Sequence, residues 1–422
     1  MVAYACPCSR PSLCQPVTAT HQREVFGFSV SQDTPYERYD WSQLTTVAWN
    51  EDPALMCAAH AAGARVVLDG RGADARGVYV NRTARAAWLA ERVQHALRHH
   101  LDGINFDLED PLPPGDPLAG EYAALVAEAA AAFHATIPGS QVSVDVPWSP
   151  YGIDGRYYDW SGLAGAADLL FVMMYDTQSQ MWGRCVAAAN SPLALARRGV
   201  QQWLDLGVPA NKLVLGLPWY GYVYPCTNHA FAAGQEQELC QLAPVGFAGA
   251  PCSDAAGRQT CYSDIAAMVR RGSSEGSNGS RASSGSSNGG GGSRGLLIGQ
   301  RGGAGGLERQ EAEQGQQQQQ QEEVLACEQP RWDDAQAAPY ARCRRASDPL
   351  THSHQVWFDD PASLERKCAL AAELGLRGVG MWHLDCLDYR CTDSTCRQGT
   401  EAMWAALRAF TGGAQVQIDD VA

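Results

Sequence analysis

The stretch LDGINFDLED (Leu101–Asp110) combines a short strand pattern with closely spaced carboxylates. Side chains alternate between the two faces of a strand. One face therefore carries Ile104, Phe106 and Leu108, and the other carries a glycine and three polar residues, Gly103, Asn105, Asp107 and Glu109. In a barrel of parallel strands, the apolar face would contact the surrounding helices and the polar face would point inward.

The same kind of strand recurs on both sides of this stretch. Short apolar, β-branched runs alternate with longer Ala/Leu-rich segments of helical spacing. The expected strands are Val25–Val30, Thr45–Trp49, Arg65–Leu68, Gly103–Leu108, Gln141–Val146, Leu169–Met174, Leu213–Leu217 and Gly378–Trp382, and the expected helices include Arg82–His99, Gly120–Ile137, Pro192–Leu206 and Pro361–Leu374. Eight such strands predict an α/β fold, a closed (β/α)8 TIM barrel. An open doubly wound sheet would alternate similarly, but no Gly-rich phosphate loop follows the first strand.

Two regions depart from this alternation. The chain has 422 residues, enough for one large barrel, and we expect residues 1–422 to form a single catalytic domain. Residues 219–360 are too long for one barrel connection, so we expect a small insertion subdomain between strands seven and eight. Inside it, residues 272–323 are rich in Ser and Gly and then in Gln, which predicts a disordered low-complexity loop.

The charge balance argues against two classes of partner. Lys and Arg number 32 and Asp and Glu number 46, so the net charge is −14. Most of such a surface would repel a nucleic-acid backbone or an anionic membrane. No segment reaches the roughly 18 consecutive apolar residues that a membrane helix needs. We therefore expect neither nucleic acid nor membrane as a partner.

The fifteen cysteines favour an oxidising compartment. Disulfides explain them better than zinc, because no CxxC pair or Cys/His doublet has zinc-finger spacing. An odd number leaves at least one thiol unpaired. The sequons Asn81-Arg-Thr and Asn278-Gly-Ser fit a glycoprotein of the lysosome, the vacuole or the extracellular space. Residues 1–20 show no apolar run of signal-peptide length, so either the leader is not visible in this sequence or the export prediction is wrong.

The carboxylates of Leu101–Asp110 are the strongest functional signal. An amide and two carboxylates destabilise a barrel interior unless they bind one another or a ligand. Barrel enzymes keep their chemistry at the carboxyl ends of the strands. A solvated acidic turn, helped by Asp110 and the run Pro111–Pro114, is the alternative, but buried like charges more often mark functional sites.

Asp107 and Glu109 have the spacing of an acid/base pair. Their backbones lie about 7 Å apart, close enough for each to influence the ionisation of the other. If Asp107 shares a proton with Glu109 or repels its charged form, Glu109 can stay protonated and act as a general acid. Both would approach a substrate from one side, so Asp107 cannot be a nucleophile that flanks the scissile bond. A 2-acetamido oxygen of the substrate could take that part, whereas a Ser or Cys nucleophile lacks an elbow motif such as GxSxG.

Asp102, Asp107 and Glu109 fit the DxxDxDxE signature of family 18 glycoside hydrolases, and the chain resembles these chitinase-like (β/α)8 barrels. Asn105 departs from the signature, because most members have Asp there. Similar stretches cover the chain except residues 272–323 and the last few residues, among them Tyr39–Gln43, Gly63–Leu68, Val146–Pro150, Phe171–Asp176, Pro218–Tyr222, Gly249–Gln259, His354–Trp357 and Gly380–Trp382. This coverage is more specific than the signature alone, and it resembles a lysosomal-type branch of the family whose strand also reads DGIN.

The resemblance implies roles for five residues. Glu109 would be the acid/base, and Asp107 would orient the acetamido group and stabilise an oxazolinium intermediate by its charge. The Tyr175 hydroxyl would bind the acetamido oxygen, and Asp176 beside it would contact the substrate. Trp382, at the end of strand eight, would form the aromatic floor under the scissile sugar.

Five further residues complete the expected substrate site. Asn105 would replace one charge of the usual carboxylate ladder with a neutral hydrogen-bonding group. Asp145, Trp148, Gln178 and Trp219 lie at or just after strands five to seven and could line the cleft. Ordinary packing at the barrel rim explains the two tryptophans equally well.

The resemblance also implies an activity. We expect a monomeric, retaining exo-type glycosidase that splits the N,N'-diacetylchitobiose core of Asn-linked glycans and releases N-acetylglucosamine from the reducing end. It would need no metal or organic cofactor. A chitinase acting on longer chitin oligomers is one alternative. A lectin that binds chito-oligosaccharides without cleaving them is the other, although such lectins usually lose the acid that Glu109 provides.

Overall fold

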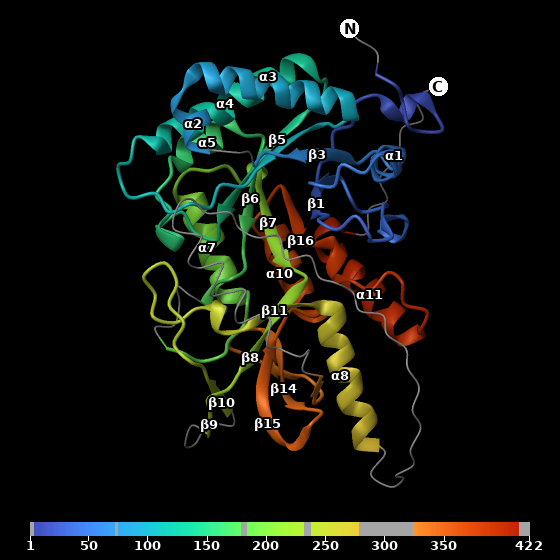
Figure 1. Cartoon of the computed structure of the whole chain (residues 1–422), viewed down its shortest axis with the longest axis vertical. Coiled ribbons are helices and arrows are strands. Elements are labelled where there is room, and N and C mark those ends of the chain that lie inside the picture. Colours follow the sequence, from blue (N-terminus) through green and yellow to red (C-terminus); the bar gives the residue numbers. More distant parts are fainter. Residues whose placement is uncertain (1–3, 72–74, 179–183, 232–237, 278–323, 413–422) are drawn as a thin grey trace.

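The computed structural model describes residues 4–71, 75–178, 184–231, 238–277 and 324–412. Within them, eight parallel strands close into a barrel in the order β1-β16-β7-β6-β5-β4-β3-β2 (Figure 1). These strands are β1 (Glu24–Phe28), β2 (Thr46–Ala48), β3 (Arg65–Asp69), β4 (Gly103–Phe106), β5 (Gln141–Pro147), β6 (Leu169–Met173), β7 (Leu213–Pro218) and β16 (Gly378–Trp382). They are the eight strands that the sequence predicts, so the (β/α)8 barrel is confirmed.

The barrel interior is filled by aromatic side chains. Phe171 on β6 contacts Phe26 and Phe28 on β1, with ring centroids 5.5 and 5.0 Å apart. Because β1 and β6 are not neighbours in the sheet, these rings meet across the inside of the barrel. Gly216 and Gly380 make room for them, since a Cβ at either position would lie within 2.5 Å of the Phe171 ring. The barrel is therefore a packed core, open to ligands only at its ends.

Helices cover the outside of the barrel. They are α1 (Pro53–Ala61), α2 (Ala75–Val80), α3 (Arg82–His99), α4 (Leu118–Thr136), α5 (Trp160–Ala166), α7 (Leu193–Asp205), α10 (Pro361–Glu373), α11 (Ser394–Ala406) and α12 (Arg408–Thr411). Short 3-10 helices span Pro11–Cys14, Tyr36–Arg38, Ile153–Gly155, Ala210–Lys212, Asp254–Ala256 and Leu384–Cys386. Side-chain caps fix several helix starts, as where Asp360 forms a capping box with Ser363. Among the described residues, no helix is both long and apolar enough to cross a membrane.

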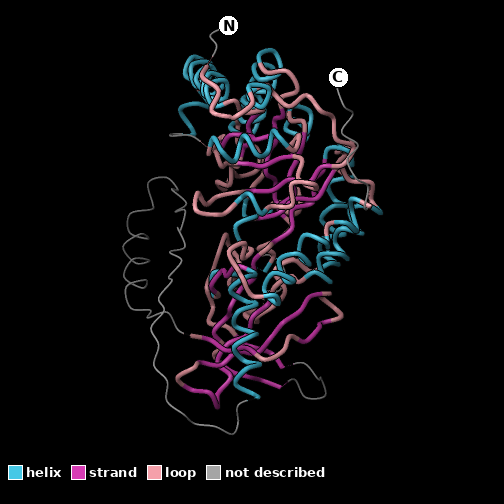
Figure 2. The backbone as a smooth tube through the Cα atoms, turned by 90° about the vertical axis from the view of Figure 1, so that its right-hand side faces the viewer, coloured by secondary structure: helices cyan, strands magenta, loops and turns pink. Residues whose placement is uncertain are grey.

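A second sheet is inserted between β7 and β16, the seventh and eighth barrel strands. Its strands are β8 (Tyr220–Pro225), β11 (Arg258–Cys261), β12 (Leu325–Cys327), β13 (Arg331–Asp333), β14 (Ala338–Arg345) and β15 (Asp348–Trp357), and β9 (Asn228–Phe231) pairs separately with β10 (Glu238–Gln241). β8 begins two residues after β7 ends, so the chain passes almost directly from the barrel into this sheet. In both views the sheet forms the end of the molecule away from α3 and α4 (Figures 1 and 2).

Helix α8 (Tyr262–Ser277) packs against this second sheet. Ile265 and Met268 contact Val223, Leu325 and Val356 in a small core separate from that of the barrel. The helix corrects one boundary, because the sequence predicts that a disordered loop starts at residue 272, whereas α8 continues to Ser277. The remainder of that loop, residues 278–323, lies outside the described residues.

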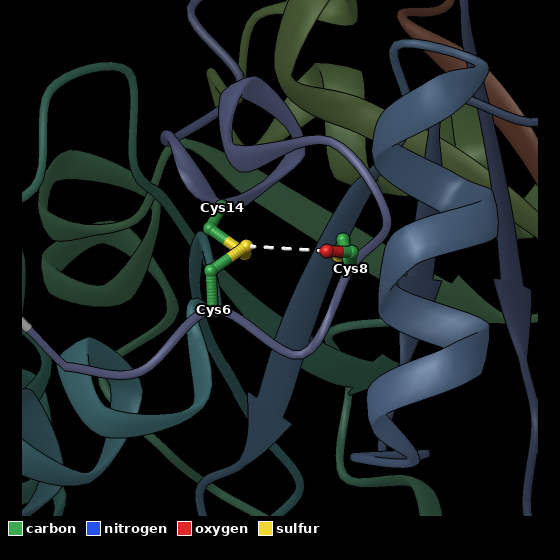
Figure 3. A group of neighbouring side chains, drawn as sticks. All are labelled: Cys6, Cys8 and Cys14. Carbon is green, nitrogen blue, oxygen red and sulfur yellow. Dashed lines mark hydrogen bonds between the residues drawn. A yellow bond between two sulfur atoms is a disulfide. The ribbon is translucent and has the colours of Figure 1, made fainter.

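Disulfides pair all cysteines except Cys368, which is buried. The pairs are Cys6–Cys14, Cys8–Cys57, Cys185–Cys252, Cys226–Cys240, Cys261–Cys386, Cys327–Cys343 and Cys391–Cys396. Figure 3 shows the first pair with Cys8 beside it. The preference for disulfides over zinc is therefore confirmed, and so is the unpaired thiol. The bond from β11 to Leu384–Cys386 also ties the inserted sheet to the end of the barrel.

The side-chain ammonium groups of both lysines in the chain bind other residues of the protein. Lys212 donates from Nζ to the carbonyl oxygens of Ala164 and Ala167, at 2.7 and 2.8 Å, where α5 ends. Lys367 on α10 is fully buried and forms an ion pair with Asp359. Each ammonium group therefore holds a helix in place.

Candidate active site

Asn105 lies fully buried inside the barrel, two residues before Asp107. Its Oδ1 accepts a hydrogen bond from Nε1 of Trp49 at 2.9 Å. Its Nδ2 donates to Ser143 Oγ at 3.0 Å and to Asp145 Oδ1 at 2.9 Å, both on β5. The amide thus joins β4 to β5 and to the loop after β2. No surface of Asn105 is exposed, and its hydrogen bonds hold Trp49, Ser143 and Asp145 in position.

Asp107 follows the last residue of β4, at the carboxyl end of the barrel. Its Oδ1 is buried and has no hydrogen-bond partner among the described residues. Burial raises the pKa of Asp107 to about 8, and the charge of Glu109 adds to this increase, while Arg71 and Arg156 oppose it. Burial and the charge of Asp107 likewise raise the pKa of Asp145. Loss of hydration on burial, and then repulsion between the two enclosed carboxylates, therefore favour the protonated forms of the pair.

Glu109 lies farther out and is 35% exposed at its side chain. Its Oε1 lies 3.1 Å from Nη2 of Arg156, and the same guanidinium nitrogen lies 3.0 Å from Oδ2 of Asp154. The Arg156 side chain is only 8% exposed, so this cation is fixed by the protein. The structure therefore encloses Asp107 and leaves Glu109 accessible, held by an arginine at the mouth of the site.

Tyr175 and Asp176 follow β6 at the same end of the barrel. Oδ1 of Asp176 accepts hydrogen bonds from the hydroxyls of Tyr220 at 2.6 Å and Tyr222 at 2.8 Å, both on β8. Part of the Asp176 residue is exposed, but its carboxylate lies among these rings, and the resulting loss of hydration raises its pKa to about 6. The ring of Tyr175 contacts that of Tyr220 edge-on, 5.8 Å between centroids. The inserted sheet thus supplies part of the site.

Trp382, the last residue of β16, is half-buried in an aromatic cluster. Its indole contacts Trp49 edge-on at 5.3 Å and Phe28 at 5.1 Å between ring centroids. The guanidinium of Arg71 lies over the other ring, 3.9 Å from the centroid of Trp49, and pairs with Asp69 at 2.7 Å. Trp49 itself has a φ of 76°, a left-handed conformation that residues other than glycine adopt rarely. These aromatic rings form a surface suited to stacking a sugar.

All four residues expected to line the cleft are buried, Asp145 beside Asn105 and the other three as follows. Trp219 is fully buried and packs edge-on against Trp404, with centroids 5.0 Å apart. Trp148 is 8% exposed and lies against Gly199 of α7, where a Cβ would clash with its carbonyl oxygen at 2.2 Å. Gln178 is buried, and its Nε2 donates to the carbonyl oxygen of Val186. For both tryptophans, packing around the barrel is therefore the correct interpretation.

Asp102 stands at the opposite end of β4 from the other signature residues. It is fully buried and accepts hydrogen bonds from the backbone N–H groups of Val17 and Val66, each at 2.8 Å. Its second oxygen, Oδ2, also lies 2.8 Å from Nε2 of His60 on α1. This carboxylate joins the N-terminal segment, α1 and β3, so its role is structural.

The sequence analysis does not identify three residues of the candidate site. Trp49, Arg71 and Arg156 all lie in loops, and none belongs to the strand signature. The first two could have been found, because Trp49 ends the predicted strand Thr45–Trp49 and Arg71 comes three residues after the predicted strand Arg65–Leu68. Arg156 has no comparable signal, since it reaches Glu109 from the loop after β5.

The comparisons with known proteins agree with this geometry. The sequence profile described as "Glycosyl hydrolases family 18" matches residues 72–386. The chain belongs to this family. Family 18 relatives include the di-N-acetylchitobiase of Rattus norvegicus, 41% identical over 408 residues that cover 96% of this chain and 93% of the relative. The di-N-acetylchitobiase of Homo sapiens is 39% identical and covers 96% of this chain and 88% of the relative.

Solved family 18 structures share the fold at low sequence identity. The GH18 chitinase from Cycas revoluta, solved with (GlcNAc)3, aligns with a TM-score of 0.58 and 16% identity, covering 92% of this chain and all of that one. The Group IV chitinase of Ostrinia furnacalis, solved with allosamidin, gives a TM-score of 0.61 at 16% identity, covering 92% of this chain and 99% of that one. Together with the family 18 relatives, these findings establish a glycosidase on a TIM barrel.

Proposed function

We propose that this family 18 protein hydrolyses the N,N'-diacetylchitobiose core of Asn-linked oligosaccharides, by a retaining mechanism in which the substrate's own acetamido group is the nucleophile. The observation that carries the mechanism is the arrangement at the end of β4, where an accessible Glu109 lies beside an enclosed Asp107 of raised pKa. The support for the substrate is the similarity to relatives named di-N-acetylchitobiase over 96% of the chain.

In the first step, Glu109 donates a proton to the glycosidic oxygen while the acetamido oxygen attacks the anomeric carbon. The glycosidic bond breaks, the leaving sugar departs as an alcohol, and an oxazolinium ring forms. In the free enzyme Glu109 Oε1 lies 3.1 Å from Nη2 of Arg156, so the side chain must turn from this guanidinium toward the glycosidic oxygen.

Asp107 acts through its changing charge. Its pKa of about 8 keeps it protonated in the free enzyme at neutral and acidic pH. The positive charge that develops on the oxazolinium ring favours the ionised carboxylate. The proton that Asp107 releases passes through Glu109 to the glycosidic oxygen, so Asp107 becomes negative as the cation forms and Glu109 is left as a carboxylate. The hydroxyl of Tyr175 can bind the acetamido oxygen meanwhile. In the second step, Glu109 takes a proton from water, which opens the ring with overall retention.

The stacking surface and the disulfides complete the proposal. Trp382 forms the floor of the site, with Trp49 at its edge, and Asp176 contacts the substrate beside Tyr175. The disulfides suit a lysosomal, vacuolar or extracellular enzyme. We propose a monomer whose substrate is a small oligosaccharide containing N-acetylglucosamine.

A product analysis tests the substrate assignment. The enzyme is incubated separately with chitobiose, with longer chito-oligomers and with an Asn-free glycan that retains its chitobiose core. We expect release of the single N-acetylglucosamine at the reducing end of the glycan core. Cleavage of only the longer oligomers would identify a chitinase instead. Saturable binding without any product would identify a lectin.

A thiazoline analogue of N-acetylglucosamine tests the mechanism separately. It mimics the oxazolinium ring, so we expect competitive inhibition much tighter than the binding of free N-acetylglucosamine. If the analogue binds no better than the free sugar, the acetamido group is not the nucleophile, and a protein carboxylate must be sought.

A further inference from the structure

Two histidines and a glutamate gather at the end of α3, outside the barrel. His95 and His99 occupy positions i and i+4 of this helix, and their rings stack with centroids 4.4 Å apart. Glu51, in the loop after β2, lies 2.5 Å from Nε2 of His95 through its Oε2. One ligand atom from each of the three residues lies within 4.8 Å of the other two.

This arrangement has the donor set of a transition-metal site. Histidines at i and i+4 on one helix face can share a single metal ion, as they do in zinc enzymes. Two imidazole nitrogens and one carboxylate oxygen supply three of the four positions of a tetrahedral zinc ion, and water can take the fourth. Imidazole favours Zn²⁺, Ni²⁺ and Cu²⁺ over Mg²⁺ and Ca²⁺, which prefer oxygen ligands only.

The electrostatic setting also suits a cation. α3 ends at His99, and the partial negative charge at a helix carboxyl end attracts cations. The next residue, His100, is not a ligand candidate, because its two ring nitrogens face the carbonyl oxygens of Cys14 and Ala5.

We propose that Glu51, His95 and His99 form a surface site for a divalent transition metal such as Zn²⁺. The site is separate from the candidate active site, and the proposed glycosidase reaction does not require it. Its effect would be structural, because the metal would link the loop after β2 to the last turn of α3. Without a metal, Glu51 contacts the ring of His95, on which the ring of His99 stacks.

Competition between the protein and a chromogenic chelator for Zn²⁺ tests the site. The protein is first treated with EDTA and dialysed, and binding is measured for the wild type, His99→Ala and Glu51→Gln. His99 is exposed, so its removal leaves the fold intact, which circular dichroism confirms. We expect one Zn²⁺ per chain, bound at least about 10-fold more weakly by each variant. His134→Ala is the matched control, since His134 is an exposed histidine on α4 that pairs with Asp168 and should not affect binding.

Two outcomes would overturn the site. One is the absence of saturable Zn²⁺ binding by the wild type, and the other is equal binding by wild type and His99→Ala. Electron paramagnetic resonance of Cu²⁺ gives an independent check, with two nitrogen ligands expected in the wild type and one in His99→Ala. An unchanged nitrogen count would place the metal elsewhere. Glycosidase activity should be the same with and without metal, so failure of this proposal leaves the proposed function unaffected.

Discussion

Each end of strand β4 carries an enclosed carboxylate, but the two differ in how completely they are hydrogen-bonded. Asp102, before the strand, accepts two backbone hydrogen bonds and lies 2.8 Å from the His60 ring. Asp107, after the strand, is enclosed, has one oxygen without a partner among the described residues, and has a pKa raised to about 8. Both belong to one signature, but Asp102 is held by hydrogen bonds at both oxygens, whereas Asp107 is not. The carboxylate at the amino end of the barrel is hydrogen-bonded within the protein. The carboxylate at the carboxyl end keeps an oxygen that a ligand can bind.

The substitution Glu109→Gln should have the largest effect on activity. Glutamine keeps the shape of the side chain but cannot donate a proton, so we expect kcat to fall by about 10²- to 10⁴-fold with chitobiose as substrate. The melting temperature should change little. Glu401→Gln, exposed on α11, is the matched control and should keep full activity. Substantial turnover by Glu109→Gln would remove this residue from the acid role.

The substitution Asp102→Ala should lower the stability of the protein but leave its activity unchanged. It leaves His60 and two backbone N–H groups buried without their acceptor, which costs about 3 to 5 kcal/mol of unfolding free energy. Urea unfolding measures this loss, and kcat per folded molecule should be unchanged. Asp102→Asn, which keeps an acceptor oxygen, should lose less. If Asp102→Ala lowers kcat as strongly as Glu109→Gln does, the division between the two ends of β4 fails.

The substitution Asp107→Asn should change how stability depends on pH. Folded Asp107 holds its proton up to a pKa of about 8, whereas the unfolded carboxyl loses it near its ordinary pKa. Between these values the unfolded state binds fewer protons, so unfolding becomes easier as pH rises, by up to about 1.4 kcal/mol per pH unit. Asparagine removes the Asp107 contribution to this slope. The difference between thermal melts at pH 5 and about pH 7.5 should therefore be smaller in the variant, and an equal slope in both proteins would contradict the raised pKa.

The His60–Asp102 pair, at the amino end of β4, should also make the folded protein less stable as pH rises. The contacts with Asp102 and the Leu13 carbonyl oxygen raise the pKa of His60, although burial opposes this. The pair therefore contributes stability that is complete below the ordinary histidine pKa and is lost as pH rises through the raised one. Both ends of β4 thus favour mildly acidic conditions, in agreement with the proposed lysosomal or vacuolar location.

The substitution Trp49→Phe should have the smallest effect. It removes the hydrogen bond to Asn105 but keeps a ring against Trp382. One such bond is worth about 1 kcal/mol, so kcat/KM should fall by less than about tenfold. Trp88→Phe is the control, because Trp88 contacts Phe106 on the helix-facing side of β4 and should leave activity unchanged. A much larger loss for Trp49→Phe would show that the network around Asn105 is itself required for the reaction.

Sequence alone predicts the barrel well, because strand and helix periodicities are local. The eight strands and Arg82–His99 appear where the alternation places them. It predicts the site less well, because a position after a strand does not reveal which way a side chain points. Trp219 shows this, since the chain continues into β8 and turns its indole onto Trp404. Arg156 and the disulfide partners depend on long-range packing, which leaves no local pattern.

The engagement of both lysines has a practical consequence for handling the protein. Amine-reactive labels and supports usually attach through free lysines, but here Lys212 is bound to two carbonyl oxygens and Lys367 is buried. Coupling through side-chain amines should therefore be inefficient, and forcing it would loosen α5 or α10. Carboxylate chemistry is no substitute, since it would consume Glu109. Immobilisation is better directed to an added tag.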